Sequence, residues 1–235
     1  GPRAGGCGSV APVGRVRAGG VHRPAVALDG PGVVIDRFGD AAVIQPNAAW
    51  AEANLAALAE ALQAVTGVSI VVKNAAGRAR GLEGLPEESG LLSGALAAPV
   101  PVPMNGATYF ADLLGGQKTG LFYDQRPNHA FAARLARGRA MLDVFAHVGG
   151  FALAGLAAGA TLALAIDGSA PALALAEAGA EASGVADRFT ARKGDAFDTM
   201  TALAGEGARF GLVVCDPPAF APSKSALEAG LRAYE

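Results

Sequence analysis

The chain has 235 residues, of which 51% are apolar and 17% are charged, with a formal net charge of −2. This composition excludes a disordered chain and a globally basic nucleic-acid-binding protein, and the length allows one large domain or two smaller ones. The two cysteines, Cys7 and Cys215, lie far apart and indicate no disulfide framework. No apolar run is long enough to span a membrane, and the N-terminus lacks the apolar core of a signal peptide, so a cytoplasmic protein is favoured.

The N-terminal part is expected to contain one small domain. Residues 1–28 are rich in Gly, Pro, Ala and Arg without a regular period, and we leave them as an unassigned lead-in. The sequence pattern of residues 29–106 predicts a small α/β domain without a recognisable set of catalytic residues. Its expected elements are strands at 33–35, 41–45 and 69–73, a turn at 36–40, a helix from 47 or 48 to about 65 that Gly67 ends, and mostly loop over 74–98.

Residues 107–235 are expected to form a second domain. It opens with a predicted strand at 108–112, followed by a segment at 113–126 that is dense in polar side chains. We expect this segment to be a hairpin that reaches over a site, although an ordinary Gly-Gly hairpin with surface polar groups is the alternative. A short helix is predicted over 131–137.

From residue 141 onward, short apolar runs alternate with helical stretches. The predicted strands lie at 141–145, 161–166, 189–193 and 210–215, and the predicted helices between them lie at 152–158, 171–182 and 199–203. Alternation with short connections predicts a parallel, doubly wound sheet, in which ligands bind at the carboxyl ends of the strands. The fold class is therefore α/β and Rossmann-like.

A glycine turn or an acid follows each of these strands. Gly149-Gly150 follows the first strand, and Asp167, Asp195 and Asp216 follow the others. An acid at the end of the second strand suits ribose hydroxyls, and Asp195 could accept a hydrogen bond from an adenine amine. Because the chain has neither a Walker lysine nor the G-x-G-x-x-G spacing, S-adenosylmethionine fits this site better than NAD or ATP. Asp143 would balance the positive charges of that cofactor.

Several motifs resemble those of one known family. These motifs are Gly115-Gly-Gln-Lys-Thr-Gly-Leu-Phe-Tyr-Asp-Gln-Arg126, Leu142-Asp-Val-Phe-Ala-His-Val-Gly-Gly-Phe151, Ile166-Asp-Gly-Ser169, Gly194-Asp-Ala-Phe197 and Asp216-Pro-Pro-Ala-Phe220. They resemble the class I S-adenosylmethionine-dependent methyltransferases that modify cytosine C5 of 23S ribosomal RNA and have an N-terminal PUA domain. The resemblance extends from about residue 29 to the end, and residues 1–30 show no recognisable PUA domain.

The resemblance implies roles for particular residues. Asp216 would be catalytic and hold the target cytosine, and Pro218 and Phe220 would bind the substrate base. The residues implied to bind the cofactor are Gln117, Lys118, Thr119, Gly120, Arg126, Asp143, Phe145, Gly149, Gly150, Asp167, Gly168, Ser169, Asp195, Ala196, Asp216 and Pro217. His147 is expected to pack rather than to bind. No metal site is expected, since His22 and His129 lack metal-ligand spacing.

The family's nucleophilic cysteine is expected beyond Glu235, so the chain resembles part of such an enzyme. Cys215 is a weak substitute, because a cysteine on an apolar strand is usually structural. Three other functions stay open: a guanine-modifying RNA methyltransferase with the same core, a nicotinamide-dependent oxidoreductase and a non-catalytic RNA-binding module. The expected partner is 23S ribosomal RNA, with no membrane, and a homodimer is allowed.

Overall fold

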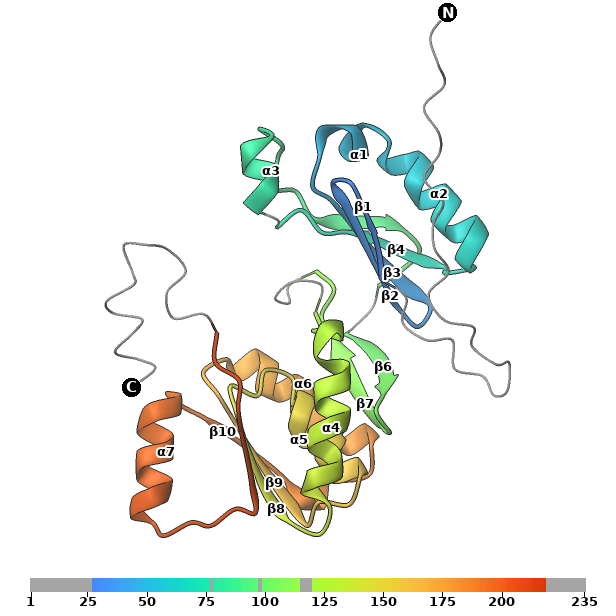
Figure 1. Cartoon of the computed structure of the whole chain (residues 1–235). Coiled ribbons are helices and arrows are strands. Elements are labelled where there is room, and N and C mark those ends of the chain that lie inside the picture. The colour runs from blue at the N-terminus through green and yellow to red at the C-terminus, as the bar shows by residue number, and fades with distance from the viewer. Residues whose placement is uncertain (1–26, 77, 97–98, 115–119, 219–235) are drawn as a thin grey trace, which may run out of the picture.

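The computed structural model describes residues 27–218 except 77, 97–98 and 115–119, and it forms two parts joined by a hairpin (Figure 1). The predictions for most of the lead-in and for Gln117, Lys118, Thr119 and Phe220 lie outside the described residues. Within the described part of the chain, no helix has the length and apolar character needed to cross a bilayer.

The first part is built on a five-stranded sheet in the order β1-β2-β3-β4-β5. Only β3 and β4 are parallel, and the other neighbours are antiparallel. The apolar side of α2 packs on this sheet through Ala59 and Leu62, which belong to the same buried cluster as Ile44 and Val71. The elements are β1 (Ala27–Gly30), β2 (Val33–Phe38), β3 (Ala41–Pro46), α1 (Ala49–Ala53), α2 (Leu55–Thr66), β4 (Ile70–Lys73), α3 (Arg78–Leu82) and β5 (Gly90–Ser93).

Two local features of this part differ from the prediction, and a third agrees with it. The β2–β3 turn comprises only Gly39 and Asp40, because the strands pair as far as Phe38 and Ala41. The single expected helix is broken at Asn54, whose side chain and backbone N–H both donate to Trp50 O, at 2.7 and 3.1 Å. Gly67 ends α2 in the left-handed conformation with φ 70°, as predicted.

The stretch expected to be mostly loop contains α3 and β5. Arg80 on α3 is fully buried and donates to Pro86 O at 2.6 Å and to Glu52 Oε2 at 3.0 Å. It also donates to Pro46 O, so one guanidinium ties α3 to α1 and to the end of β3. A buried arginine at the centre of these contacts explains the ordered helix where composition predicted a loop.

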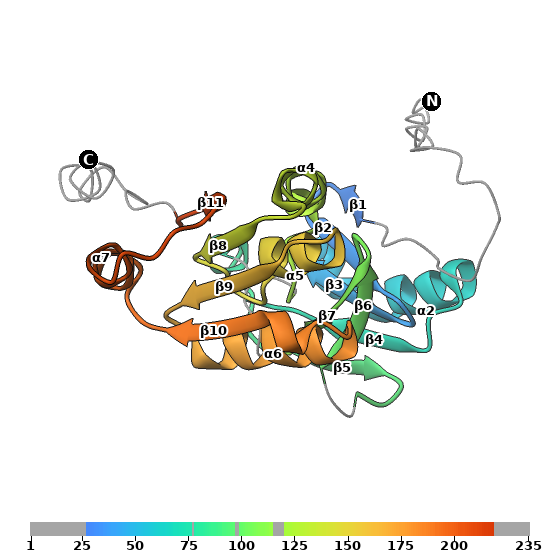
Figure 2. The same ribbon diagram turned by 90° about the horizontal axis from the view of Figure 1, so that it is seen from below.

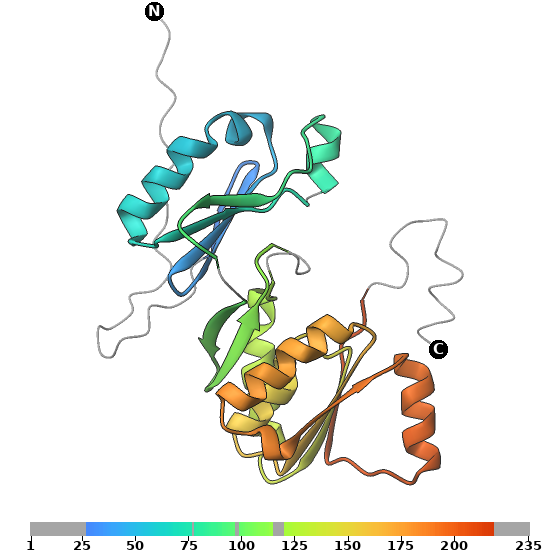
Figure 3. The ribbon, with the colours of Figure 1, turned by 180° about the vertical axis from the view of Figure 1, so that it is seen from behind.

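A hairpin of β6 (Val100–Met104) and β7 (Ala107–Ala111) lies between the two parts (Figure 3). This hairpin spans the expected domain boundary at residue 106. After β7, the described residues of 113–126 form no second strand and lead instead into the 3₁₀ turn η1 (Tyr123–Gln125). Helix α4 (Arg126–Ala136) begins five residues before the prediction, because Pro127 fits the first helical turn.

The second part is a parallel sheet in the order β10-β9-β8-β11, as the alternating pattern predicted. Helices α4, α5 and α6 cover one face, and α7 lies on the other (Figure 2). Met141 and Leu142 are neighbours in β8 that point into the two different cores. The remaining elements are β8 (Ala140–Val144), α5 (Gly150–Ala157), β9 (Leu162–Asp167), α6 (Ala170–Ala182), η2 (Ala186–Arg188), β10 (Phe189–Lys193), α7 (Ala196–Gly205) and β11 (Leu212–Cys215).

The two parts share one hydrophobic core. Phe38 and Val72 from the first part belong to the same buried cluster as Met141 and Leu153 from the second. Tyr123 strengthens this junction, since its ring lies 5.1 Å from that of Phe38 and its hydroxyl donates to Arg37 O at 2.9 Å. The segment just before α4 is therefore fixed against the first part.

Candidate functional site

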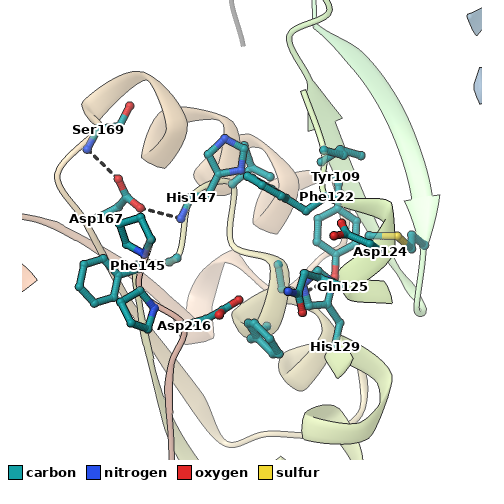
Figure 4. Close-up of a pocket in the computed structure, with 18 residues that line it drawn as sticks. Tyr109, Phe122, Asp124, Gln125, His129, Phe145, His147, Asp167, Ser169 and Asp216 are labelled. Atoms are coloured by element: carbon teal, nitrogen blue, oxygen red, sulfur yellow. Dashed lines mark hydrogen bonds between the residues drawn. The ribbon is translucent and has the colours of Figure 1, made fainter. Parts of the chain in front are cut away.

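A pocket of about 430 Å³ lies at the carboxyl end of the parallel sheet, within the roughly 300–1,000 Å³ typical of small-molecule sites (Figure 4). It combines predicted site residues with residues that the sequence did not single out. Its lining includes Tyr109, Phe122, Asp124, Gln125, His129, Phe145, His147, Gly150, Asp167, Ser169, Asp216, Pro217 and Pro218.

The turn that follows β8 has a strained backbone. Phe145 and His147 have φ values of 63° and 49°, and Gly149 has a φ of 78°. Left-handed φ values are uncommon for residues other than glycine and concentrate at functional sites. The backbone N–H of His147 donates to Asp167 Oδ2 at 2.8 Å, and that of Ala146 donates to Ile166 O at 3.0 Å. The end of β9 therefore holds this turn in place.

Asp167 occupies the position predicted for a ribose-binding acid. Its Oδ1 accepts from the N–H of Ser169 and its Oδ2 from that of His147, both at 2.8 Å. A carboxylate has about four acceptor sites, so these two bonds leave room for two ligand hydroxyls. Ser169 Oγ accepts from Ala172 N at 3.3 Å and caps α6. Gly168, between Asp167 and Ser169, is exposed.

Gly150 begins α5 at a point of close contact with His129. A Cβ on Gly150 would lie 2.7 Å from both Cε1 and Nε2 of His129, so the imidazole occupies the space that a side chain would need. The ring also makes a T-shaped contact with Phe151 at 4.5 Å. Burial lowers the pKa of His129 to about 4, against an opposing effect of Asp124, so the pocket wall here is neutral at pH 7.

Asp143 lies below the glycine turn and is only 1% exposed. Its Oδ2 accepts from Ala152 N at 2.9 Å, while Oδ1 has no hydrogen-bond partner among the described residues. Burial raises the pKa of Asp143 to about 7, and the negative charges of Asp167 and Asp216 act in the same direction. This buried acid touches the first turn of α5 rather than forming the pocket wall.

Other predicted cofactor residues lie beside the pocket rather than in its wall. Asp195 is exposed and caps α7, accepting from Phe197 N at 2.9 Å and Asp198 N at 3.1 Å, and Ala196 is buried in the first turn. Phe197 links this end to the pocket, because its ring lies 6.5 Å from that of Phe145. On the other side, Gly120 is buried with a φ of 97° and Arg126 is exposed at the start of α4.

Several pocket residues lie before the sheet in the sequence and were not predicted. Tyr109 from β7 and His129 from α4 reach the pocket only through tertiary packing, and the same holds for Phe122, Asp124 and Gln125. His147, expected to pack, contacts the Phe122 ring edge-on at 5.3 Å and also lines the pocket. Phe122, Asp124 and Gln125 belong to the motif at residues 115–126, but the resemblance assigned no role to their side chains.

Tyr109 fixes the glycine turn from the opposite side. It is fully buried, and its hydroxyl donates to Gly150 O at 3.0 Å. Burial, followed by the charge of Asp143, raises the pKa of Tyr109, so this hydroxyl remains a donor throughout the physiological range.

We expect Tyr109→Phe to weaken cofactor binding about 2- to 12-fold, the effect of losing one neutral hydrogen bond worth about 0.5–1.5 kcal/mol. Calorimetric titration with S-adenosylhomocysteine measures this change. Thr66→Val also removes one hydroxyl that donates to a backbone carbonyl, Leu62 O in α2 of the first part, and serves as the matched control. Equal affinity of Tyr109→Phe and wild type would show that this hydroxyl does not position the turn.

The third strand end in the pocket is formed by Asp216, Pro217 and Pro218, which follow β11. Asp216 is exposed, and its backbone N–H points to Val144 O at 3.4 Å. Cys215 precedes it at the sheet edge, where burial and the charge of Asp216 raise the pKa of its thiol. A raised pKa opposes thiolate formation, so Cys215 has none of the activation expected of a nucleophile. Among the described residues, no group of three or more His, Cys, Asp or Glu could hold a metal ion.

The parallel sheet, the glycine turn after β8 and the acid ending β9 define a Rossmann-like methyltransferase. Residues 53–233 match the model of the S-adenosylmethionine-dependent methyltransferase family, and the chain belongs to this family. S-adenosylmethionine, predicted from the strand-end acids, is therefore its cofactor.

Among curated proteins, the chain is similar to enzymes named ribosomal RNA large subunit methyltransferase I. It is 35% identical over 207 residues to those of Photobacterium profundum and Shewanella denitrificans, which is 87% of this chain and 52% of each relative. The chain therefore spans about half the length of the curated relatives it matches.

Solved structures show the same fold at lower identity. A SAM-dependent methyltransferase from Streptococcus mutans has a TM-score of 0.68 at 22% identity, covering 86% of this chain and 54% of that one. A methyltransferase complexed with SAH also has a TM-score of 0.68, at 24% identity, covering 82% and 50%. The tRNA m1G37 methyltransferase of M. jannaschii has a TM-score of 0.61 at 17% identity, covering 84% and 56%. These likenesses confirm the predicted Rossmann-like methyltransferase fold.

Proposed function

We propose that this chain belongs to an enzyme that methylates large-subunit ribosomal RNA, at C5 of a cytosine in 23S RNA. The observation that supports this most strongly is the 35% identity, over 87% of the chain, to relatives named ribosomal RNA large subunit methyltransferase I. The cytoplasmic location, the homodimer and the division at residue 106 remain predictions, as does the expectation that the chain is part of a longer enzyme.

The pocket fits S-adenosylmethionine on chemical grounds. Asp167 has free acceptor capacity for a pair of ribose hydroxyls, and Ser169 stands beside it. The aromatic rings of Phe145 and Phe197 offer apolar surface next to Asp195, which would bind the adenine. Asp143 lies beneath the glycine turn and accepts from Ala152 N, so it would support the turn that faces the cationic end of the cofactor. When bound, the cofactor supplies an electrophilic methyl group.

The substrate base would lie at Asp216, Pro217 and Pro218. Asp216 is exposed at the pocket rim, so its carboxylate can accept from the exocyclic amine on the Watson–Crick edge of a flipped cytosine. The two prolines fix the backbone on which that edge rests. Phe220, assigned to base stacking by the resemblance, lies outside the described residues.

Cytosine C5 is a weak nucleophile, and the reaction therefore needs a thiolate that adds to C6. After methylation, loss of the C5 proton and elimination of the thiolate restore the aromatic ring. Cys215 does not fit this role, because it lies outside the lining of the pocket and its thiol pKa is raised rather than lowered. We therefore assign the nucleophile to a cysteine outside the described residues.

The test is transfer of tritiated methyl groups from S-adenosylmethionine to unmodified 23S RNA by the whole protein, followed by nucleoside analysis. We expect 5-methylcytidine, and we expect Cys215→Ser to retain activity. Methylguanosine as the product would instead support the guanine-modifying alternative. No RNA methylation at all would contradict the proposed function.

A further inference from the structure

Helix α4 has an exposed face that combines apolar, aromatic and cationic side chains. Phe131 is 56% exposed and Leu135 is 44% exposed. Arg134 lies over the ring of Phe131, with its Cζ 5.5 Å from the ring centroid. The opposite side of the helix is buried through His129, Ala132, Ala133 and Ala136. The helix is thus anchored by one side, and an aromatic ring and a guanidinium remain on the other.

Helix α4 and the residues just after it form a basic stretch in a chain whose net charge is negative. Residues 126–139 contain four arginines and no acid, while the rest of the sequence has 15 Lys and Arg against 21 Asp and Glu. The ion pairs of Lys73 and Arg80 with Glu52, of Arg188 with Asp187 and of Arg192 with Glu206 all lie outside this stretch. A local positive field therefore surrounds Phe131 although the net charge is negative.

This face leads to the proposed catalytic site. Gln125 and His129, at the start of α4, line the pocket, and Figure 2 shows α4 beside the sheet edge at β8 and β11. Strand β11 runs directly into Asp216 at the pocket rim. A polymer with one unit held at Asp216 can therefore pass along α4 without leaving the surface.

We propose that the exposed face of α4 formed by Phe131, Arg134 and Leu135 binds a single-stranded RNA segment next to the target base. The inference rests on the proposed function and adds to it the surface that holds the substrate. A base stacks on Phe131, and Arg134 contacts a phosphate, as in other proteins that bind single strands through aromatic platforms and basic grooves. Arg126 and Arg137 contact the flanking backbone.

Charge favours RNA over a second copy of the chain as the occupant. A two-fold interface through this face would bring Arg134 and Arg137 of one copy against the same residues of the other. Like charges that face one another without acids between them repel, and this repulsion increases as water is excluded. A polyanion instead neutralises all of these groups and releases counterions.

The experiment compares Phe131→Ala and Arg134→Gln with the wild-type full chain in filter binding to unmodified large-subunit ribosomal RNA transcribed in vitro, over a salt series. We expect Phe131→Ala to weaken binding roughly 5- to 150-fold, the loss of one stacked base. Arg134→Gln should weaken binding and reduce the slope of log affinity against log salt by about 0.7, the value for one phosphate contact to a single strand.

The controls separate this surface from general effects on fold and charge. Arg192→Gln removes an arginine from β10, at the opposite edge of the sheet, and should leave RNA binding unchanged. Affinity for S-adenosylhomocysteine should stay at the wild-type value in all three variants, which shows that the pocket is intact. Sedimentation velocity of each variant reports any change of oligomeric state.

Three results would overturn the inference, and they differ in whether the proposed function is also contradicted. Wild-type RNA affinity in both α4 variants would remove this face from the RNA path and leave the proposed function standing. Dissociation of a dimer by Phe131→Ala without loss of RNA affinity would identify the face as a contact between copies. Absence of RNA binding and methylation by the wild type would contradict the proposed function itself.

Discussion

Replacing Asp143 by asparagine is expected to remove a pH-dependent loss of stability. The carboxyl is buried, and its pKa is about 7 in the folded chain, against 3.8 for an ordinary aspartate. Between these pH values the folded state keeps a proton that the unfolded state has lost. The free energy of unfolding therefore falls as pH rises through this window and levels off above pH 7.

From pH 5 to pH 8, the wild type should lose roughly 2–3 kcal/mol relative to Asp143→Asn, since each pKa unit is worth about 1.36 kcal/mol. An asparagine can still accept from Ala152 N and has no charge to bury. Denaturant unfolding of both proteins at several pH values measures the difference.

The stability of the wild type must be compared with that of a variant, because His129 and His147 change stability with pH in the opposite direction to Asp143. Burial lowers the pKa of His129 to about 4 and also lowers that of His147, so their contribution is lost as pH falls below about 6.5. These contributions are present in both proteins and cancel in the difference. Asp198→Asn, which changes an exposed acid in the first turn of α7, serves as the control substitution. Parallel curves for wild type and Asp143→Asn would show that Asp143 ionises in the folded chain as it does in water.

Asp167→Ala is expected to weaken S-adenosylhomocysteine binding by about 1.5–3 kcal/mol, or roughly 10- to 150-fold, the effect of removing a charged hydrogen-bond partner. The carboxylate would contact the ribose, and it also accepts from His147 N and Ser169 N. Its removal thus releases a turn whose residues have strained φ values. Asp167→Asn keeps one acceptor oxygen and should fall between alanine and wild type.

Calorimetric titration of these variants measures the effect, with Asp187→Ala as the control. Asp187 is an exposed acid in η2 whose side chain is 78% accessible, so its loss should leave affinity unchanged. An affinity of Asp167→Ala equal to that of the wild type would exclude Asp167 from the cofactor site.

The sequence predicted the parallel sheet well because each strand has a local signal. The runs before Asp167 and Asp216 are apolar, short and followed by an acid or a glycine, and the fold brings these ends together at one edge. Element β5 has no such signal, since Leu91 and Leu92 are adjacent apolar residues that both stay partly exposed at a sheet edge. The break at Asn54 depends on one side-chain hydrogen bond to Trp50 O, which no periodicity shows.

The site was predictable only where strand position decides the role of a residue. Asp167 and Ser169 follow a predicted strand, and the structure places both in the pocket wall. Asp195 follows one as well, but its carboxylate is exposed and caps α7. Tyr109 and His129 could not be found in this way, because long-range packing of β7 and α4 on α5 brings them to the glycine turn.

The contact of Tyr123 with Arg37 and Phe38 has a consequence for how such chains diverge. Recombination between related genes could join the first part of one relative to the parallel sheet of another. Tyr123 would then face a different first part from the one whose Arg37 O it bonds and whose Phe38 ring it contacts. The next residues, Asp124 and Gln125, are in the pocket wall, so a mismatch at the junction would displace the wall itself. Recombination breakpoints should therefore be rare within residues 27–125. Substitutions in the first part should be accompanied by compensating substitutions in the methyltransferase part.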